Sequence, residues 1–150
     1  MGSATYEQVH LMLRLFELRR ESRLREARAW FVEHFHPASL DDFQKYAQRS
    51  EDGTNIRMVV SYWEMVASIL NRGLIDDDLF FESNGEIWIV WDRIRPIITA
   101  WRNMYKNPTV FSNLEAAGKR FEAWREGRAP GSSAALRQML EQARSKPRTP

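Results

Sequence analysis

The segment NIRMVVSYWEMVASILNR, residues 55–72, decides the fold class, because its apolar residues recur every three or four positions. This spacing gathers the apolar side chains on one side of an α-helix and leaves polar side chains on the other side. The apolar side is formed by Val59, Tyr62, Trp63, Val66, Ile69 and Leu70. The polar side is formed by Arg57, Ser61, Glu64, Ser68 and Asn71. Gly73 follows and is typical of a helix C-cap, so the segment predicts an amphipathic helix.

A second periodic segment, residues 86–106, carries apolar residues that are alternately four and three positions apart, which is a heptad-like spacing. Pro96 lies inside this segment. Because proline has no backbone N–H, we predict that the helix kinks near Pro96. Helical spacing recurs along most of the chain, and strand-like alternation is nearly absent. We therefore predict an all-α fold, a bundle of about six helices.

Turn-forming and capping residues give the expected boundaries of these helices. A turn is expected at residues 51–55, and Asp76 is expected to cap a short helix. Asn107 and Pro108 are expected to be the N-cap and the first residue of a later helix.

The domain organisation follows from the same pattern. We expect one helical domain over residues 1–126 and a linker with the sequence GRAPGSS at residues 127–133. Residues 134–150 are expected to form a weak helix and a basic, disordered tail.

The first predicted helix, residues 5–34, is apolar on nearly every side in its first half. One stripe, Tyr6, Val9, Leu13 and Phe16, has helical spacing, and the segment is apolar beyond that stripe. The residues expected to associate with a second copy are Leu11, Leu13, Leu15, Phe16 and Leu18. A helix that is apolar all round must be covered on more than one side. We expect a homo-oligomer, most simply a dimer; packing within the domain core and binding to a membrane surface are the alternatives.

Charge is segregated along the chain, although 22 basic and 20 acidic residues nearly balance. Residues 76–92 carry six acidic residues and no Lys or Arg, whereas residues 93–150 have a net charge of +8. Arginine outnumbers lysine by 18 to 4, which favours bidentate recognition of phosphate. Nucleic-acid binding is therefore an alternative function. Its candidate residues are Arg93, Arg95, Arg120, Arg125 and Arg128. The basic residues are equally suited to pairing with the acidic segment, within one chain or between two.

No residue pattern predicts catalysis or metal binding. The chain has no Cys, and His34 and His36 are two residues apart, so they do not share a helix face. The run Asp76–Asp78 is explained by helix capping better than by a cation, since the spacing of a calcium loop is missing. Phosphate-binding loops and nucleophile motifs are also missing. We predict a protein that is not an enzyme and has no cofactor.

A small-ligand pocket is the third functional alternative. Glu64 lies on the polar side of the segment at residues 55–72 and becomes a buried acid if a neighbouring helix packs over it. The candidate lining residues are Tyr62, Trp63, Glu64 and Arg102. The simpler interpretation is a solvated helix face.

Several short motifs resemble an uncharacterised bacterial helical family known as domain of unknown function 4760. They are VSYWE at residues 60–64, NRGLID at residues 71–76, Trp91, and Arg102 after Pro96. The resemblance covers residues 24–126 and implies a helical fold without an established activity. Many members of that family carry an N-terminal membrane span, and no apolar run of about 20 residues occurs here. With no Cys and no signal-peptide pattern, a cytoplasmic location is expected.

Overall fold

The computed structural model describes residues 3–145, which form nine α-helices and one 3-10 helix and contain no strand. The all-α prediction is confirmed. The helices are α1 Tyr6–Arg19, α2 Ser22–His34, α3 Leu40–Gln48, α4 Ser50–Asn71, α5 Asp77–Phe81, α6 Glu86–Ile94, α7 Ile98–Tyr105, α8 Ser112–Arg128 and α9 Ser132–Ser145, with the 3-10 helix η1 at Arg95–Ile97. About six helices were expected, and the number is larger because two predicted helices are divided.

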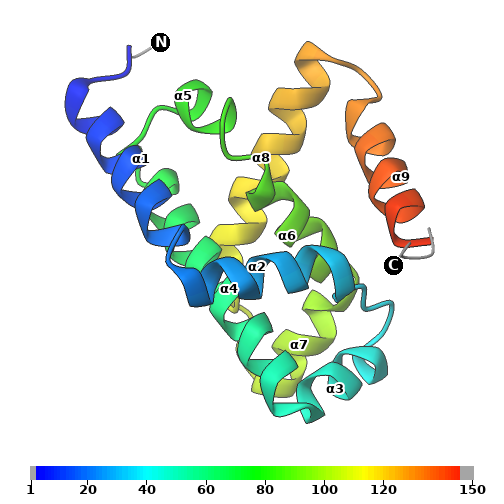
Figure 1. Ribbon diagram of the computed structural model, residues 1–150. Helices are drawn as coiled ribbons and strands as arrows, with labels where there is room; N and C mark the ends of the chain where they lie inside the picture. The colour runs from blue at the N-terminus through cyan, green and yellow to red at the C-terminus, as the bar shows by residue number, and fades with distance from the viewer. Residues whose placement is uncertain (1–2, 146–150) are drawn as a thin grey trace.

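Helix α4 is the centre of the bundle. It packs against α2, α3, α6 and α8, and its apolar side is the side predicted from the sequence. Trp63 on α4 and Trp88 and Trp91 on α6 are fully buried in the core. Figure 1 shows α1 and α9 on opposite sides of this core.

The predicted helix at residues 5–34 is wrong as a single element, because it breaks between Arg19 and Ser22. Glu21 causes the break by capping α2: its carboxylate accepts hydrogen bonds from the backbone N–H groups of Arg23 and Leu24 at 2.9 and 2.8 Å. The same two bonds lower the pKa of Glu21. A residue that caps a new helix cannot also continue the preceding one, so the chain changes direction here.

The expected kink at Pro96 is confirmed. The segment Arg95–Ile97 is a 3-10 helix that separates α6 from α7. Proline at this position lacks the N–H that an α-helix needs, and the tighter turn accommodates it.

Three expected boundaries are wrong. Residues 51–54 belong to α4 and are not a turn, because α4 already begins at Ser50. Helix α8 does not start at Pro108 but at Ser112, because Phe111 adopts a left-handed conformation, with φ of 54°, that a continuous α-helix does not allow. The expected linker is shortened to residues 129–131 between α8 and α9. Residues 146–150 of the expected tail lie outside the described residues.

Candidate functional site

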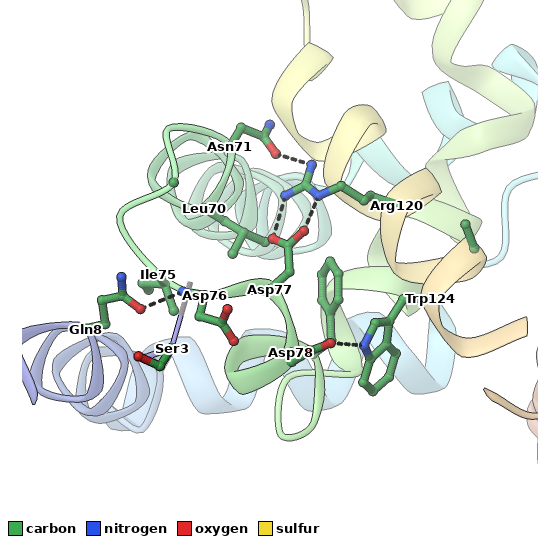
Figure 2. Close-up of a pocket in the computed structure, with 13 residues that line it drawn as sticks. Ser3, Gln8, Leu70, Asn71, Ile75, Asp76, Asp77, Asp78, Arg120 and Trp124 are labelled. Carbon is green, nitrogen blue, oxygen red and sulfur yellow. Dashed lines mark hydrogen bonds and ion pairs between the residues drawn. The ribbon is translucent and has the colours of Figure 1, made fainter. Parts of the chain in front are cut away.

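A cavity of about 740 Å³ lies where the start of α1, the C-terminal end of α4, α5 and α8 come together (Figure 2). Arg120 of α8 crosses it and donates two hydrogen bonds to the carboxylate of Asp77, at 2.8 and 3.1 Å. A third hydrogen bond from Arg120 reaches the side-chain oxygen of Asn71 on α4 at 2.8 Å. One guanidinium therefore ties α4, α5 and α8 together.

The three aspartates of this cavity have separate structural partners. Asp76 is the N-cap of α5 and accepts a hydrogen bond from the N–H of Leu79 at 3.0 Å, so the predicted capping role is confirmed. Asp78 accepts a hydrogen bond from the indole N–H of Trp124 at 2.7 Å. Asp77 is already paired with Arg120. Within residues 3–145, no group of three His, Cys, Asp or Glu residues is arranged to hold a metal ion.

The expected ligand pocket at Tyr62, Trp63, Glu64 and Arg102 is divided between two sides of α4. Tyr62 donates its hydroxyl to the backbone carbonyl of Leu15 at 2.5 Å, and burial raises its pKa to about 12. Trp63 donates its indole N–H to Glu86 at 3.1 Å. These two aromatic residues therefore face α1 and α6.

Glu64 and Arg102 face the segment that leads into α8. Glu64 accepts hydrogen bonds from the backbone N–H groups of Asn113 and Leu114, at 3.3 and 2.7 Å. It thus supplies the cap that the first turn of α8 needs. Arg102, from α7, donates a hydrogen bond to the backbone carbonyl of Val110 in the same segment, at 2.9 Å. A helix does pack over Glu64, as the sequence hypothesis required, but this carboxylate is engaged in capping that helix.

Two of the arginines expected to contact nucleic acid, Arg93 and Arg95, are bonded to other parts of the chain. Arg93 donates to three backbone carbonyls at the C-terminal end of α2, at distances of 2.9 to 3.3 Å. Burial lowers the pKa of Arg93. Arg95 pairs with Glu122 of α8 at 2.6 Å.

The other three arginines in this group also have partners in the chain. Arg120 is paired with Asp77, as described above. Arg128 contacts Asp78 at 3.3 Å, and Arg125 lies 4.2 Å from the ring centre of Trp88.

The acidic segment and the basic C-terminal third meet within one chain. Their ion pairs are Asp77 with Arg120, Asp78 with Arg128, and Asp92 with Arg137. The charge segregation in the sequence thus joins α5 and α6 to α8 and α9. Little positive charge is therefore left unpaired at Arg120, Arg128 and Arg137.

A polar cluster that was not predicted from the sequence joins α1, α2, α4 and α6. Arg28 and Glu86 form a bidentate ion pair, with both distances 2.8 Å, and this bond raises the pKa of Arg28. Arg19, only 9% exposed, donates to Asn84 at 3.1 Å, and burial lowers its pKa. The one available signal was that polar residues 19–23 interrupt an apolar helix. The partners of Arg19 and Arg28 are more than 50 positions away in sequence.

The exposed side of α1 carries the apolar stripe noted in the sequence. Tyr6, Leu13 and Phe16 are 75%, 49% and 41% exposed, and Val9 between them is half-buried. Leu15 is instead buried against the core. Of the remaining expected association residues, Leu11 is half-buried and Leu18 is 40% exposed.

A family model described as "Domain of unknown function (DUF4760)" matches residues 4–121. The chain belongs to the DUF4760 family. The match includes α1, so the exposed stripe is part of the DUF4760 domain itself. Neither a curated protein nor a solved structure matches this DUF4760 chain. In the part of the chain that the structure describes, every helix is too short or too polar to cross a membrane.

Proposed function

We propose that this protein is a non-enzymatic, cytoplasmic interaction domain that forms a homodimer through α1. The observation that carries the proposal is the exposed stripe Tyr6, Val9, Leu13 and Phe16, called here the α1 stripe. Its members are three, four and three residues apart, which is the spacing of a helix–helix seam. Apolar side chains at this spacing on a water-exposed helix favour a partner helix with the same spacing.

A second copy of the chain is the simplest partner. A two-fold interface uses the same surface on both subunits, and the α1 stripe supplies a matching seam from each chain. The guanidinium of Arg19 lies 4.8 Å from the ring centre of Phe16, and Arg19 also holds Asn84 of the core. Phe16 is therefore kept in place before any partner arrives, which lowers the entropy cost of association.

Two hydrogen bonds between α1 and the core support the same proposal, because they fix the direction of the helix. Tyr62 binds the carbonyl of Leu15, and Gln8 accepts a hydrogen bond from the N–H of Asp76 at 3.0 Å. A helix anchored near both ends presents its outer stripe in one orientation. Such preorganisation is typical of a specific interface.

The test is light scattering after size-exclusion chromatography, at low and at high salt. The double variant Leu13→Asp, Phe16→Asp is expected to be a monomer, whereas the wild type is a dimer at both salt concentrations, because an apolar interface is not screened. The matched control is Leu74→Asp, Met139→Asp, which places two charges at apolar residues that are 52% and 65% exposed elsewhere. A dimer that survives the α1 substitutions, or a wild type that is a monomer, contradicts the proposal.

Nucleic-acid binding is the weaker alternative, because each of its five candidate arginines has a partner in the chain. A pocket at Glu64 is weaker for a similar reason: the carboxylate caps α8. Neither alternative has an observation in its favour comparable to the α1 stripe.

A further inference from the structure

A second cavity, of about 470 Å³, lies between α3, α4 and α7. Figure 1 shows α3 and α7 at the end of the molecule away from α1. We call it the α3–α7 groove. The residues that line it are Phe43, Gln44, Ala47, Gln48, Gly53, Ile56, Arg57, Trp101, Met104 and Tyr105. Its volume is in the range of pockets that bind small molecules.

The floor of the groove is aromatic and apolar. Phe43 and Trp101 are buried, with their ring centres 4.4 Å apart, and Ile56 is 2% exposed beside them. At the mouth, Met104 and Tyr105 are 44% and 62% exposed. Apolar surface therefore continues from the floor to the solvent, which is the composition of a binding pocket.

The groove stays open because the residues at its narrow side are small. Gly53 of α4 lies so close to α3 that a Cβ atom there would be 3.2 Å from the carbonyl oxygen of Ala47. Ala47 itself contributes only a methyl group. Because α3 and α4 approach so closely at Ala47 and Gly53, larger side chains that would fill the groove are excluded at these positions.

The polar groups of the groove have one sign of charge. Among the described residues that line it, Arg57 is the one charged residue and none is acidic. The guanidinium of Arg57 donates one hydrogen bond to the hydroxyl of Thr54 at 3.2 Å, on the exposed side of α4. Gln44 and Gln48 add neutral amides at the rim. This arrangement favours a ligand with one negative charge.

We propose that the α3–α7 groove binds a small aromatic monoanion, such as an aryl carboxylate. The aromatic body packs on Phe43 and Trp101, since aromatic rings favour offset or edge contacts with each other. The sulfur of Met104 adds a favourable contact with a ring edge. The anionic group pairs with Arg57 at the rim. This inference goes beyond the proposed function and does not depend on it.

The experiment is isothermal titration of the full chain with 2-naphthoate, with 2-naphthamide as the uncharged analogue and decanoate as the aliphatic one. Naphthoate is expected to bind about tenfold more tightly than naphthamide, the effect of one charge-assisted hydrogen bond. Equal affinity for the two naphthyl compounds, or no binding at millimolar concentration, overturns the proposal. Tighter binding of decanoate overturns the aromatic assignment.

Two substitutions locate the site. Arg57→Gln is expected to remove the tenfold preference for naphthoate. The control Arg72→Gln, at the C-cap of the same helix, is expected to retain it, because Arg72 is an exposed arginine that also bonds locally, to the carbonyl of Ser68 at 3.0 Å. Equal effects of the two substitutions overturn the assignment of Arg57.

A third substitution, Ala47→Phe, is designed to fill the groove and to weaken all three ligands at least tenfold, with retained helicity checked by circular dichroism. Unchanged binding in this folded variant places the ligand elsewhere and overturns the proposal. If Ala47→Phe does not fold, the shifts that naphthoate causes in amide spectra of the wild type decide, and they are expected in α3, α4 and α7. The α1 double variant is expected to bind naphthoate normally, so the dimer and the groove succeed or fail separately.

Discussion

Replacing Gly118 of α8 with alanine should destabilise the fold, although alanine is the better helix former. A Cβ atom built at Gly118 lies 2.4 Å from Cγ, 2.5 Å from Cδ1 and 2.7 Å from Cβ of Trp91. Ordinary contacts of a Cβ are at 3.4–4 Å, so α6 and α8 have to separate by roughly an ångström. Trp91 is 2% exposed, and its indole has no free space into which to rotate. The substitution therefore forces two packed helices apart.

The magnitude follows from two opposing effects. Overpacking a close-packed core costs about 1–3 kcal/mol, and three short contacts place this site at the upper end. The change from glycine to alanine inside a helix contributes about 1 kcal/mol in the other direction. The net loss in the free energy of unfolding is about 2 kcal/mol, or about 4–8 °C in Tm for a domain of this size.

The assay is urea unfolding followed by circular dichroism, with Gly127→Ala as the matched control. Gly127 is on the same helix, but nothing lies within 4 Å of a Cβ there, so the control should be neutral or stabilising by up to about 1 kcal/mol. A second control is Gly118→Ala combined with Trp91→Leu, in which the smaller side chain should relieve part of the cost. If Gly118→Ala is as stable as Gly127→Ala, the close packing of α6 on α8 is refuted.

Three further predictions concern charged groups. Glu86→Gln should lower the free energy of unfolding, measured in urea, by about 2–3 kcal/mol. The reason is that Arg28 loses its bidentate partner in a site where both side chains are only 18% exposed. An unchanged stability would contradict the structural role of this pair. Burial and the nearby Arg93 lower the pKa of His36 to about 4, below the unfolded value of about 6.5, so the unfolded state binds the extra proton between these pH values. The free energy of unfolding should then decrease by about 1 kcal/mol as pH falls from 6.5 to 4, since solvent screens a half-buried ring, and His36→Asn should flatten this part of the stability profile. Arg137→Gln should accelerate amide exchange in α9 while α4 keeps its protection. The reason is that the bidentate pair between Arg137 and Asp92 of α6, at 2.8 and 3.0 Å, anchors α9. Equal exchange in the two helices would count against that anchor.

The parts of the fold that depend on local chemistry were predictable from the sequence. Gly73 does end α4 in the left-handed region, with φ of 74°, and Asp76 does cap α5. Pro96 does interrupt its helix. In each case the cause lies in the covalent structure of one residue (no Cβ in Gly73, a carboxylate in Asp76, a ring in Pro96), so its neighbours in space do not alter the outcome.

The start of α8 was not predictable in this way. Phe111 precedes the helix in a left-handed conformation, with φ of 54°, and provides no side-chain cap. The cap comes from Glu64, about 50 positions earlier in the sequence. Asn107 has the composition of an N-cap but forms its own local turn. Only the packing of α4 against α8 decides whether Glu64 or Asn107 caps the helix.

The two candidate surfaces also differ in how far they could be predicted from the sequence. The spacing of the α1 stripe was visible in the sequence, but which side of the helix faces solvent depends on the break at Glu21 and on the bonds of Arg19. The α3–α7 groove was not predicted, because α7, about 50 positions later in the chain, packs beside the consecutive helices α3 and α4 to form it. Its open space is a property of how Gly53 and Ala47 approach, which no periodic pattern records.

In the proposed dimer, the two-residue connection between α1 and α2, Arg20 and Glu21, would be the hinge for an exchange of α1 between copies. The bonds that hold α1 to its own core, from Tyr62 to Leu15 and from Arg19 to Asn84, are equally available to the α1 of another chain once this connection straightens. A swapped dimer and a side-by-side dimer would then share every contact of α1 with a core. They would differ in lifetime: the side-by-side form separates on dilution, whereas the swapped form must first release Leu15 and Arg19 from a buried site.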